Sequence, residues 1–129
     1  MDKSATQWMI TPLRKYATFE GRARRKEFWW FELFVSLVSL ALILTEVAVV
    51  GFDAARKLSF GPSTLFSFAI LIPGLAVAFR RLHDIDRSAW WLLITLIPFI
   101  GVVILLVWHC QRGTAGPNRF GPDPINDGE

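Results

Sequence analysis

The apolar residues of this chain are gathered into three long blocks, and most of the charged residues lie between the blocks. The blocks cover residues 28–52, 63–79 and 89–109. A soluble helical domain would instead interleave polar residues at helical spacing to make a polar outer face. Only 19% of the residues are charged, against roughly 25% in average soluble domains. The segregation of the two residue classes therefore predicts an integral membrane protein.

Each block is long enough, or nearly so, to cross a bilayer as a helix. A hydrocarbon core of roughly 30 Å needs about 20 helical residues. Lipid leaves no backbone group unpaired, so spans are helices or closed barrels, and these blocks lack the alternation of barrel strands. We expect an all-α, multi-pass transmembrane helical bundle in one membrane domain over residues 1–129. Its expected parts are an N-terminal cytoplasmic or interfacial segment (1–21), transmembrane helices over 28–52, 63–82 and 89–109, and a Gly/Pro-rich tail (110–129).

The distribution of Lys and Arg predicts the orientation of the chain. With three spans, the N-terminal segment and the second loop together hold ten of the 14 basic residues, and the first loop and the tail hold four. Positively charged loops stay in the cytoplasm. The N-terminus is therefore predicted to be cytoplasmic, and three plain spans would place the tail outside. Five tryptophans at block ends fit an interfacial aromatic belt: Trp29, Trp30, Trp90, Trp91 and Trp108.

The third block allows a second topology. Pro98 and Gly101 lie in its middle, and they would suit the tip of a re-entrant hairpin or a break between two short helices. Each arm would hold only about ten residues, which is too short to span the bilayer. In this alternative the tail returns to the side of the second loop.

Glu32 and Glu46 are ionisable residues inside the first block. They share a helix face with Ser36 and Ser39, because the spacings are four, three and seven residues. An unpaired ionisable group in hydrocarbon is costly, so this face is expected to point into the bundle. The expected partners lie at the ends of the spans: Arg80 or Arg81 for Glu32, and Arg56 or Lys57 for Glu46. These contacts would join helices, or both glutamates would line a path in an oligomeric transporter or channel.

The second loop is the densest polar segment, with one His, two Asp and three Arg within residues 80–88. The planar fork of arginine suits phosphate. The sequence therefore offers a candidate anion or headgroup site made of Arg24, Arg25, Arg80, Arg81 and Arg87. A salt-bridged turn, in which Asp84 or Asp86 caps the next helix, is the structural alternative.

Other chemistry at this loop is less favoured. A metal site of His83, Asp84 and Asp86 would need adjacent helical residues to converge beside arginines that repel a cation. An enzyme acting on a lipid-linked substrate would use His83 and Asp84 as an acid/base pair, since histidine titrates near neutral pH. No nucleophile accompanies them, and the single cysteine, Cys110, excludes a disulfide within the chain. We therefore predict no catalytic residue, cofactor or metal.

Five motifs occur along the chain in a recognisable order. They are residues 19–29 (FEGRARRKEFW), 80–84 (RRLHD), 88–91 (SAWW), 97–101 (IPFIG) and 118–124 (NRFGPDP). In these motifs the chain resembles a widespread family of small bacterial inner-membrane proteins of unknown function, the YhaH/YhaI type. The resemblance implies a multi-pass protein of the bacterial inner membrane and supplies no reaction or substrate.

The resemblance also marks a candidate polar site in the motifs at residues 80–84 and 118–124, formed by His83, Asp84, Asn118 and Asp123. If these two motifs form one site, they must lie on the same side of the membrane. That would favour the arrangement in which the third block is a hairpin. We expect a non-enzymatic module that binds anionic lipid headgroups or another membrane protein, or that forms a homo-oligomer. Nucleic acid is not an expected partner, because basic residues beside apolar spans fit topology and lipid contacts.

Overall fold

The computed structural model of the chain describes residues 3–126, and its regular elements are helices. In chain order they are α1 (Ala5–Arg14), α2 (Arg25–Val50), α3 (Phe52–Lys57), α4 (Pro62–Asp84), the 3₁₀ helix η1 (Ala89–Leu96) and α5 (Ile100–Cys110). Residues 3–126 contain no β-strand, apart from an isolated bridge between Asn118 and Gly121. The prediction of an all-α fold is confirmed.

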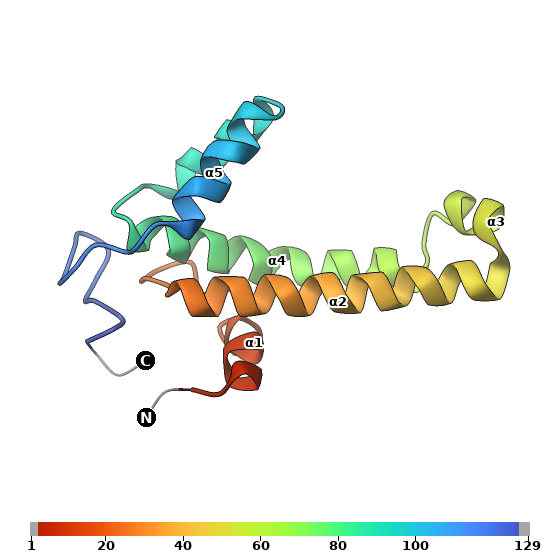
Figure 1. Cartoon of the computed structure of the whole chain (residues 1–129), viewed down its shortest axis with the longest axis horizontal. Coiled ribbons are helices and arrows are strands. Elements are labelled where there is room, and N and C mark those ends of the chain that lie inside the picture. Colours follow the sequence, from red (N-terminus) through yellow and green to blue (C-terminus); the bar gives the residue numbers. More distant parts are fainter. Residues whose placement is uncertain (1–2, 127–129) are drawn as a thin grey trace.

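The two long helices, α2 and α4, run side by side and form the axis of the molecule (Figure 1). With 26 and 23 residues, they are about 39 and 35 Å long, which exceeds the roughly 30 Å of a bilayer core. Many of their large apolar side chains face outward, among them Leu37, Leu40, Val49, Leu65 and Phe68. A soluble monomer rarely exposes such a continuous apolar surface. Both helices are therefore apolar and long enough to cross a membrane.

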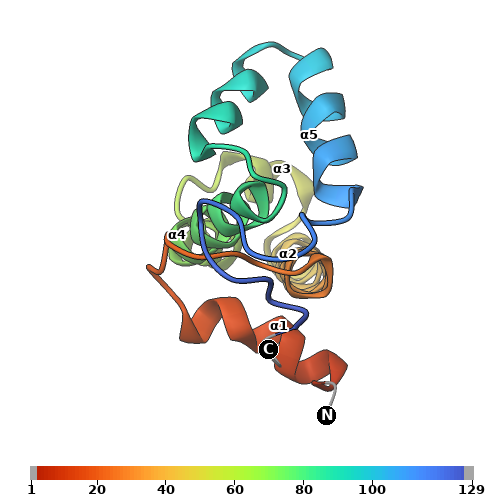
Figure 2. The ribbon, with the colours of Figure 1, turned by 90° about the vertical axis from the view of Figure 1, so that its left-hand side faces the viewer.

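The buried core lies near one end of this helix pair. It consists of Ala23, Phe28, Phe31 and Val77, and Leu13 of α1 packs against it. Figure 2 shows that α1 crosses one side of the α2/α4 pair, while η1 and α5 rise from the other side. The core thus joins α1 to the two long helices at the end where the chain begins.

Pro73 lies inside α4 without ending the helix. Because proline has no N–H, it cannot bond the carbonyl four residues earlier, which is that of Ala69. The hydroxyl of Tyr16 donates to this oxygen at 2.7 Å. The segment after α1 is thereby anchored to α4 at the carbonyl that proline leaves free.

The third apolar block is split into two short antiparallel helices, η1 and α5 (Figure 2). Pro98 cannot continue the hydrogen-bond ladder of a helix, and the carbonyl of Ile94 accepts from Ile97 N instead. Phe99 has φ 64° and ψ −60°, and Ile100 N donates to Pro98 O at 2.8 Å. This is a γ-turn with positive φ, a rare and strained conformation. The block reverses direction at this turn.

The structure therefore has the alternative arrangement of the third block rather than one helix over 89–109. With eight and 11 residues, the arms are about 16 and 17 Å long, roughly half of a bilayer core. The tail returns to the end of the helix pair where the N-terminal segment lies (Figure 1). One continuous helix over 89–109 is therefore not formed, and of the two arrangements that the sequence left open the structure has the hairpin.

The two arms touch at both ends of the hairpin. Near the tip, a Cβ added at Gly101 would collide with the carbonyl oxygen of Ile94, so the backbones approach closely there. At the base, Trp91 and Trp108 meet edge to face with ring centroids 5.5 Å apart. The guanidinium of Arg87 lies 4.1 Å from the centroid of Trp108. A small residue at the tip and an aromatic–cation contact at the base hold the hairpin closed.

We predict that Gly101→Ala opens the hairpin. The new methyl group must displace backbone, and such overpacking destabilises by about 1–3 kcal/mol. The measurement is the thermal unfolding midpoint of the purified protein in detergent. The matched control is Gly74→Ala in α4, where a Cβ meets nothing within 4 Å. Equal midpoints for the two variants would show that the close approach at Gly101 is not needed.

Candidate functional site

Six charged residues are buried together at the end of the helix pair where the tail returns. This buried charge cluster consists of Arg22, Glu27, Arg80, Arg81, Asp84 and Asp123. Three segments contribute to it: the stretch before and at the start of α2, the last turn of α4, and the tail. The family motifs at residues 19–29, 80–84 and 118–124, which are far apart in sequence, meet here. The three positive and three negative formal charges balance.

Asp84 is at the centre of the cluster. Its Oδ1 accepts from Arg22 Nε at 3.0 Å, and its Oδ2 accepts from Arg81 Nη1 at 2.7 Å. The backbone carbonyl of Asp84 also accepts from Thr114 N at 2.7 Å. A Cβ at Gly113 would collide with this carboxylate, so the tail passes directly over it. Breaking a buried ion pair leaves an uncompensated charge, which makes each of these partners essential to the others.

The two arginines that bind Asp84 also bind carbonyl groups of the tail. Arg22 donates from Nη1 to Gly116 O at 2.7 Å and from Nη2 to Thr114 O at 2.5 Å. Arg81 donates to His109 O, at 3.2 and 3.1 Å, and to Gln111 O. Carbonyls at the end of a helix and in an irregular loop have no helical partner. Guanidinium groups supply enough donors to satisfy them, and so fasten the base of the hairpin and the tail to α4.

Arg80 joins α4 to the segment before α2. Its Nη1 lies 2.5 Å from Glu27 Oε1, and its Nε donates to Thr18 O at 2.9 Å. The backbone carbonyl of Arg80 accepts from Ala23 N at 2.9 Å. The remaining nitrogen, Nη2, is buried and has no hydrogen-bond partner among residues 3–126. The guanidinium is thus only partly satisfied.

His83 and Asp84 are neighbours in sequence but do not form a pair. The ring nitrogen Nδ1 of His83 lies 3.1 Å from Gly21 O, and because a carbonyl only accepts, this nitrogen carries the proton. The ring stacks on Phe120 with centroids 4.0 Å apart. Asn118 Nδ2 donates to His83 O at 2.9 Å. These contacts place His83 and Asn118 in the packing between α4 and the tail.

Asp123 organises the loop of the tail. Its carboxylate accepts from Gly116 N and from Ile125 N, each at 3.0 Å. Hydrogen bonds from the backbone N–H groups of Ile125 and Gly116 hold the pKa of Asp123 below its ordinary value. The charged form of this carboxylate is therefore the one that the loop binds. The four residues of the candidate polar site, which include His83, Asp84 and Asn118, are brought to one end of the molecule.

The five arginines of the candidate anion site do not converge. Arg80 and Arg81 are used within the buried charge cluster. Arg24 lies over the ring of Trp8, at 5.2 Å from its centroid, and Arg25 donates to Cys110 O at 3.2 Å. Arg87 lies at the base of the hairpin, over Trp108. The set is therefore distributed over the whole end of the protein and forms no single site.

The intramembrane glutamates have different surroundings from those expected. Glu46 accepts from Ser63 N at 2.6 Å and from Ser63 Oγ at 2.8 Å, so it caps the start of α4 instead of pairing with Arg56 or Lys57. An acidic group is favourable at a helix N-terminus. Arg80 and Arg81, the partners expected for Glu32, are instead bound to Glu27 and Asp84.

Arg22 and Glu27 are the two members of the cluster that sequence reasoning did not single out. Both lie in the motif at residues 19–29, of which only Arg24 and Arg25 were assigned to a candidate site from the sequence. Arg22 follows Gly21, which has φ 84°, a conformation that glycine adopts readily. This glycine was the available signal that the chain turns here and directs Arg22 inward. In the described part of the chain, no group of three or more His, Cys, Asp or Glu residues is placed to hold a metal ion.

We predict that Asp84→Asn destabilises the fold severely. The substitution removes the negative charge that Arg22 and Arg81 share, and losing one partner of a buried pair costs about 3–5 kcal/mol. The matched control is Asp86→Asn, because Asp86 pairs with Arg119 at the surface, where the side chains are 49% and 61% exposed. An exposed pair contributes only about 0–1 kcal/mol.

The measurement is the thermal midpoint together with the rate at which trypsin cleaves the tail. Asp84→Asn should lower the midpoint and expose the tail to cleavage, whereas Asp86→Asn should change neither. Comparable behaviour of the two variants would contradict a central role for Asp84.

Comparison with known proteins gives matches over most of the chain. The family model described as protein of unknown function (DUF805) matches residues 16–122. Inner membrane protein YhaH of Escherichia coli (strain K12) is 47% identical over 117 residues, which cover 91% of this chain and 95% of YhaH. Inner membrane protein YhaI of the same strain is 44% identical over 118 residues, which cover 92% of this chain and 95% of YhaI. No solved structure matches the chain significantly.

The resemblance that the five motifs indicated is thus confirmed over nearly the whole length. The family match includes Arg22, Arg80, Arg81 and Asp84, and so covers most of the buried charge cluster. The chain is therefore a bacterial inner-membrane protein that belongs to the DUF805 family, a family of unknown function.

Proposed function

We propose that this protein is a non-enzymatic membrane module that binds anionic lipid headgroups of the cytoplasmic leaflet through one basic end. The observation that supports this most is the position of the basic residues. Seven Lys or Arg precede or begin α2, three lie at the end of α4 and just after it, and two lie in the tail. Because the hairpin returns the tail, these 12 of 14 residues share one end, and only Arg56 and Lys57 lie at the other.

The charge difference between the two ends orients the molecule. Cytoplasmic segments carry the excess of Lys and Arg, so the end with 12 basic residues belongs in the cytoplasm. In this orientation the N-terminal segment, the turn after α4 and the tail are all cytoplasmic. The asymmetry is larger than the ten against four expected for three plain spans.

Several basic residues outside the buried charge cluster are exposed at this end. The cluster is neutral overall, and so adds little to the field at the surface. The exposed basic residues at this end are Arg14, Arg25, Lys26, Arg112 and Arg119. Arg25 and Lys26 line a shallow hollow together with Trp29 and Trp30. Basic and aromatic side chains in this combination fit the headgroup level of a membrane.

The hairpin of η1 and α5 fits shallow insertion into the same leaflet. Its outer residues are strongly exposed and apolar, with Leu96 78% and Phe99 86% exposed. The hairpin leans away from the α2/α4 pair instead of lying along it (Figure 1). Shallow insertion keeps the irregular backbone at the tip away from the middle of the bilayer, where unpaired backbone groups are not tolerated. Because α1 and the hairpin lie on opposite sides of the pair, both would contact lipid in this placement.

Neither alternative function gains a supporting observation. A path lined by Glu32 and Glu46 would need both carboxylates free, and Glu46 is bound to Ser63 at the start of α4. An acid/base pair of His83 and Asp84 would need them to face one substrate, and each is bound to different groups. The lipid-binding proposal instead depends on basic and aromatic residues that are exposed at the surface.

A reporter fusion tests the orientation. Alkaline phosphatase fused after the C-terminus should be inactive and green fluorescent protein at the same place should be fluorescent, because both report a cytoplasmic tail. The same two reporters inserted at Ser59, between α3 and α4, should give the opposite pattern. Active phosphatase at the C-terminus would overturn the proposed orientation.

Charge reversal tests lipid binding. We expect Lys26→Glu combined with Arg112→Glu to lower the preference for phosphatidylglycerol over phosphatidylcholine several-fold, since each basic residue near an anionic surface contributes about 1 kcal/mol. The preference is measured by electron spin resonance with spin-labelled forms of both lipids in reconstituted membranes. The matched control, Arg56→Glu with Lys57→Glu at the other end, should keep the preference. A loss that is equal in both double variants, or absent from both, counts against a headgroup-binding basic end.

A further inference from the structure

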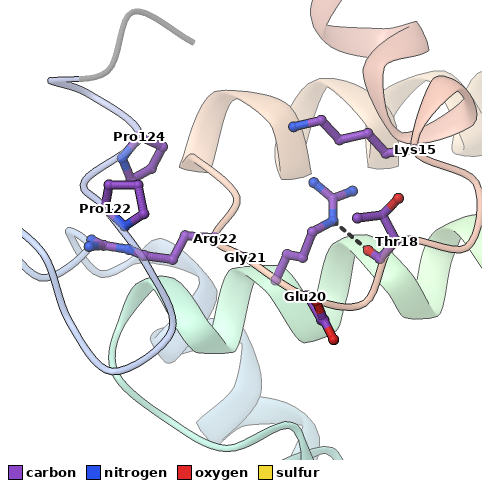
Figure 3. A pocket seen from close by; sticks show the side chains of 8 residues that line it. Lys15, Thr18, Glu20, Gly21, Arg22, Pro122 and Pro124 are labelled. Carbon is purple, nitrogen blue, oxygen red and sulfur yellow. Dashed lines mark hydrogen bonds between the residues drawn. The ribbon is translucent and has the colours of Figure 1, made fainter.

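A small cavity lies where the segment between α1 and α2, the end of α4 and the tail meet (Figure 3). Its volume is about 300 Å³, and its walls include Lys15, Thr18, Arg22, Arg80 and Pro122. The cavity therefore joins the three segments that the buried charge cluster holds together. Its lining carries three basic side chains at the end of the protein that we place in the cytoplasm.

Arg80 lines this cavity and carries a buried donor that has no acceptor among residues 3–126. The residue is only 1% exposed, its Nε is bound to Thr18 O and its Nη1 is bound to Glu27. Nη2 is the guanidinium nitrogen without an acceptor among residues 3–126. Leaving a buried charged donor unmet is costly. An acceptor that enters the cavity and reaches Nη2 would remove this cost.

The charges around the cavity favour an anion. Lys15 supplies an ammonium group, whereas the charge of Arg22 is compensated by Asp84 and its donors are used by Asp84 and the tail. Glu20 is the acidic residue of the lining, and Figure 3 shows its side chain extending away from those of Lys15 and Arg22. A carboxylate that points away weakens the positive potential less than one that points inward.

We infer that this cavity binds a phosphate group, with phosphate oxygens accepting from Arg80 Nη2 and Lys15 Nζ. Several oxygens on one centre allow a phosphate to reach both cations, and charge-assisted hydrogen bonds of this kind are the strong ones. Pro122 at the wall has no N–H and leaves apolar room for the organic part of a phosphate ester. The phosphate belongs to a lipid headgroup or to a soluble phosphate ester. This site deepens the proposed function, because it adds one defined pocket to a basic surface.

The test uses full-length protein in nanodiscs, with two probes. Inorganic phosphate is titrated against protein in phosphatidylcholine nanodiscs, and phosphatidic acid is the lipid probe in nanodiscs of otherwise the same composition. Binding is followed through the NMR signal of the Arg80 Nε–H in protein labelled with ¹⁵N-arginine. Because Arg80 itself supports the fold through Glu27, the variants are Lys15→Gln and Pro122→Glu. Lys57→Gln removes the same charge from an exposed position at the other end of the protein and is the matched control.

We expect the Arg80 signal to shift with at least one probe, and Lys15→Gln to weaken that binding roughly tenfold, as loss of one charge-assisted hydrogen bond implies. Pro122→Glu should abolish binding by placing a carboxylate in the cavity, and Lys57→Gln should leave it unchanged. A response to phosphatidic acid alone identifies a headgroup site, and a response to inorganic phosphate identifies a site that also takes soluble phosphate.

Two results would overturn the inference: no shift of the Arg80 signal with either probe, or equal weakening by Lys15→Gln and Lys57→Gln. Neither result would remove the proposed function, because the preference for phosphatidylglycerol depends on exposed residues outside the cavity. Conversely, the unmodified protein could show no preference for phosphatidylglycerol while the Arg80 signal still shifts with a probe. That result would leave the cavity as a phosphate site and remove the broader headgroup-binding role. The two proposals can thus fail separately.

Discussion

The rest of the structure depends on the carboxylate of Asp84, held between Arg22 and Arg81. A charge that is removed from water must be compensated where it is buried, and here the compensating groups come from different parts of the chain. Arg22 precedes α2, Arg81 belongs to α4, and Thr114 of the tail binds the backbone of Asp84 itself. Satisfying one buried carboxylate therefore fixes the N-terminal segment, the second long helix and the tail in one arrangement. The arginines then use their remaining donors on tail carbonyls.

The reversal of the chain at Phe99 is the second constraint, because it decides what this end of the molecule contains. Without the turn, the tail would lie across the membrane from Asp84, and the buried charge cluster could not form. With it, 12 of the 14 basic residues gather at one end. The same geometry leaves two short apolar arms and the helix α1 on opposite sides of the α2/α4 pair (Figure 2). A neutral interior with a basic, aromatic exterior is the arrangement from which the lipid-binding proposals follow.

Much of the helical fold could be predicted from the lengths of the apolar blocks and from the positions of proline and glycine within them. The lengths of the first two apolar blocks, set against bilayer thickness, already indicate α2 and α4. Pro98 and Gly101 indicate a break in the third block, although the pattern alone left a continuous span and a hairpin both open. The candidate site was less accessible: His83, Asp84, Asn118 and Asp123 were grouped, but Arg22 and Glu27 were overlooked. Their partners are distant in sequence, and a charged residue in a basic motif shows no local sign of being buried.

The sequence by itself determined that this is a helical membrane protein with a strong charge asymmetry, because hydrophobic length and the positions of Lys and Arg are local properties. It also marked the three polar motifs. Only the tertiary structure decided which arginines pair with buried carboxylates and which stay at the surface, since that depends on which chain segments meet. Arg80 illustrates the difference: in sequence it is one of five similar arginines, whereas in the fold it pairs with Glu27, and its buried Nη2 has no acceptor among residues 3–126. The physical reason is that burial and pairing are set by long-range packing, which residue spacing does not encode.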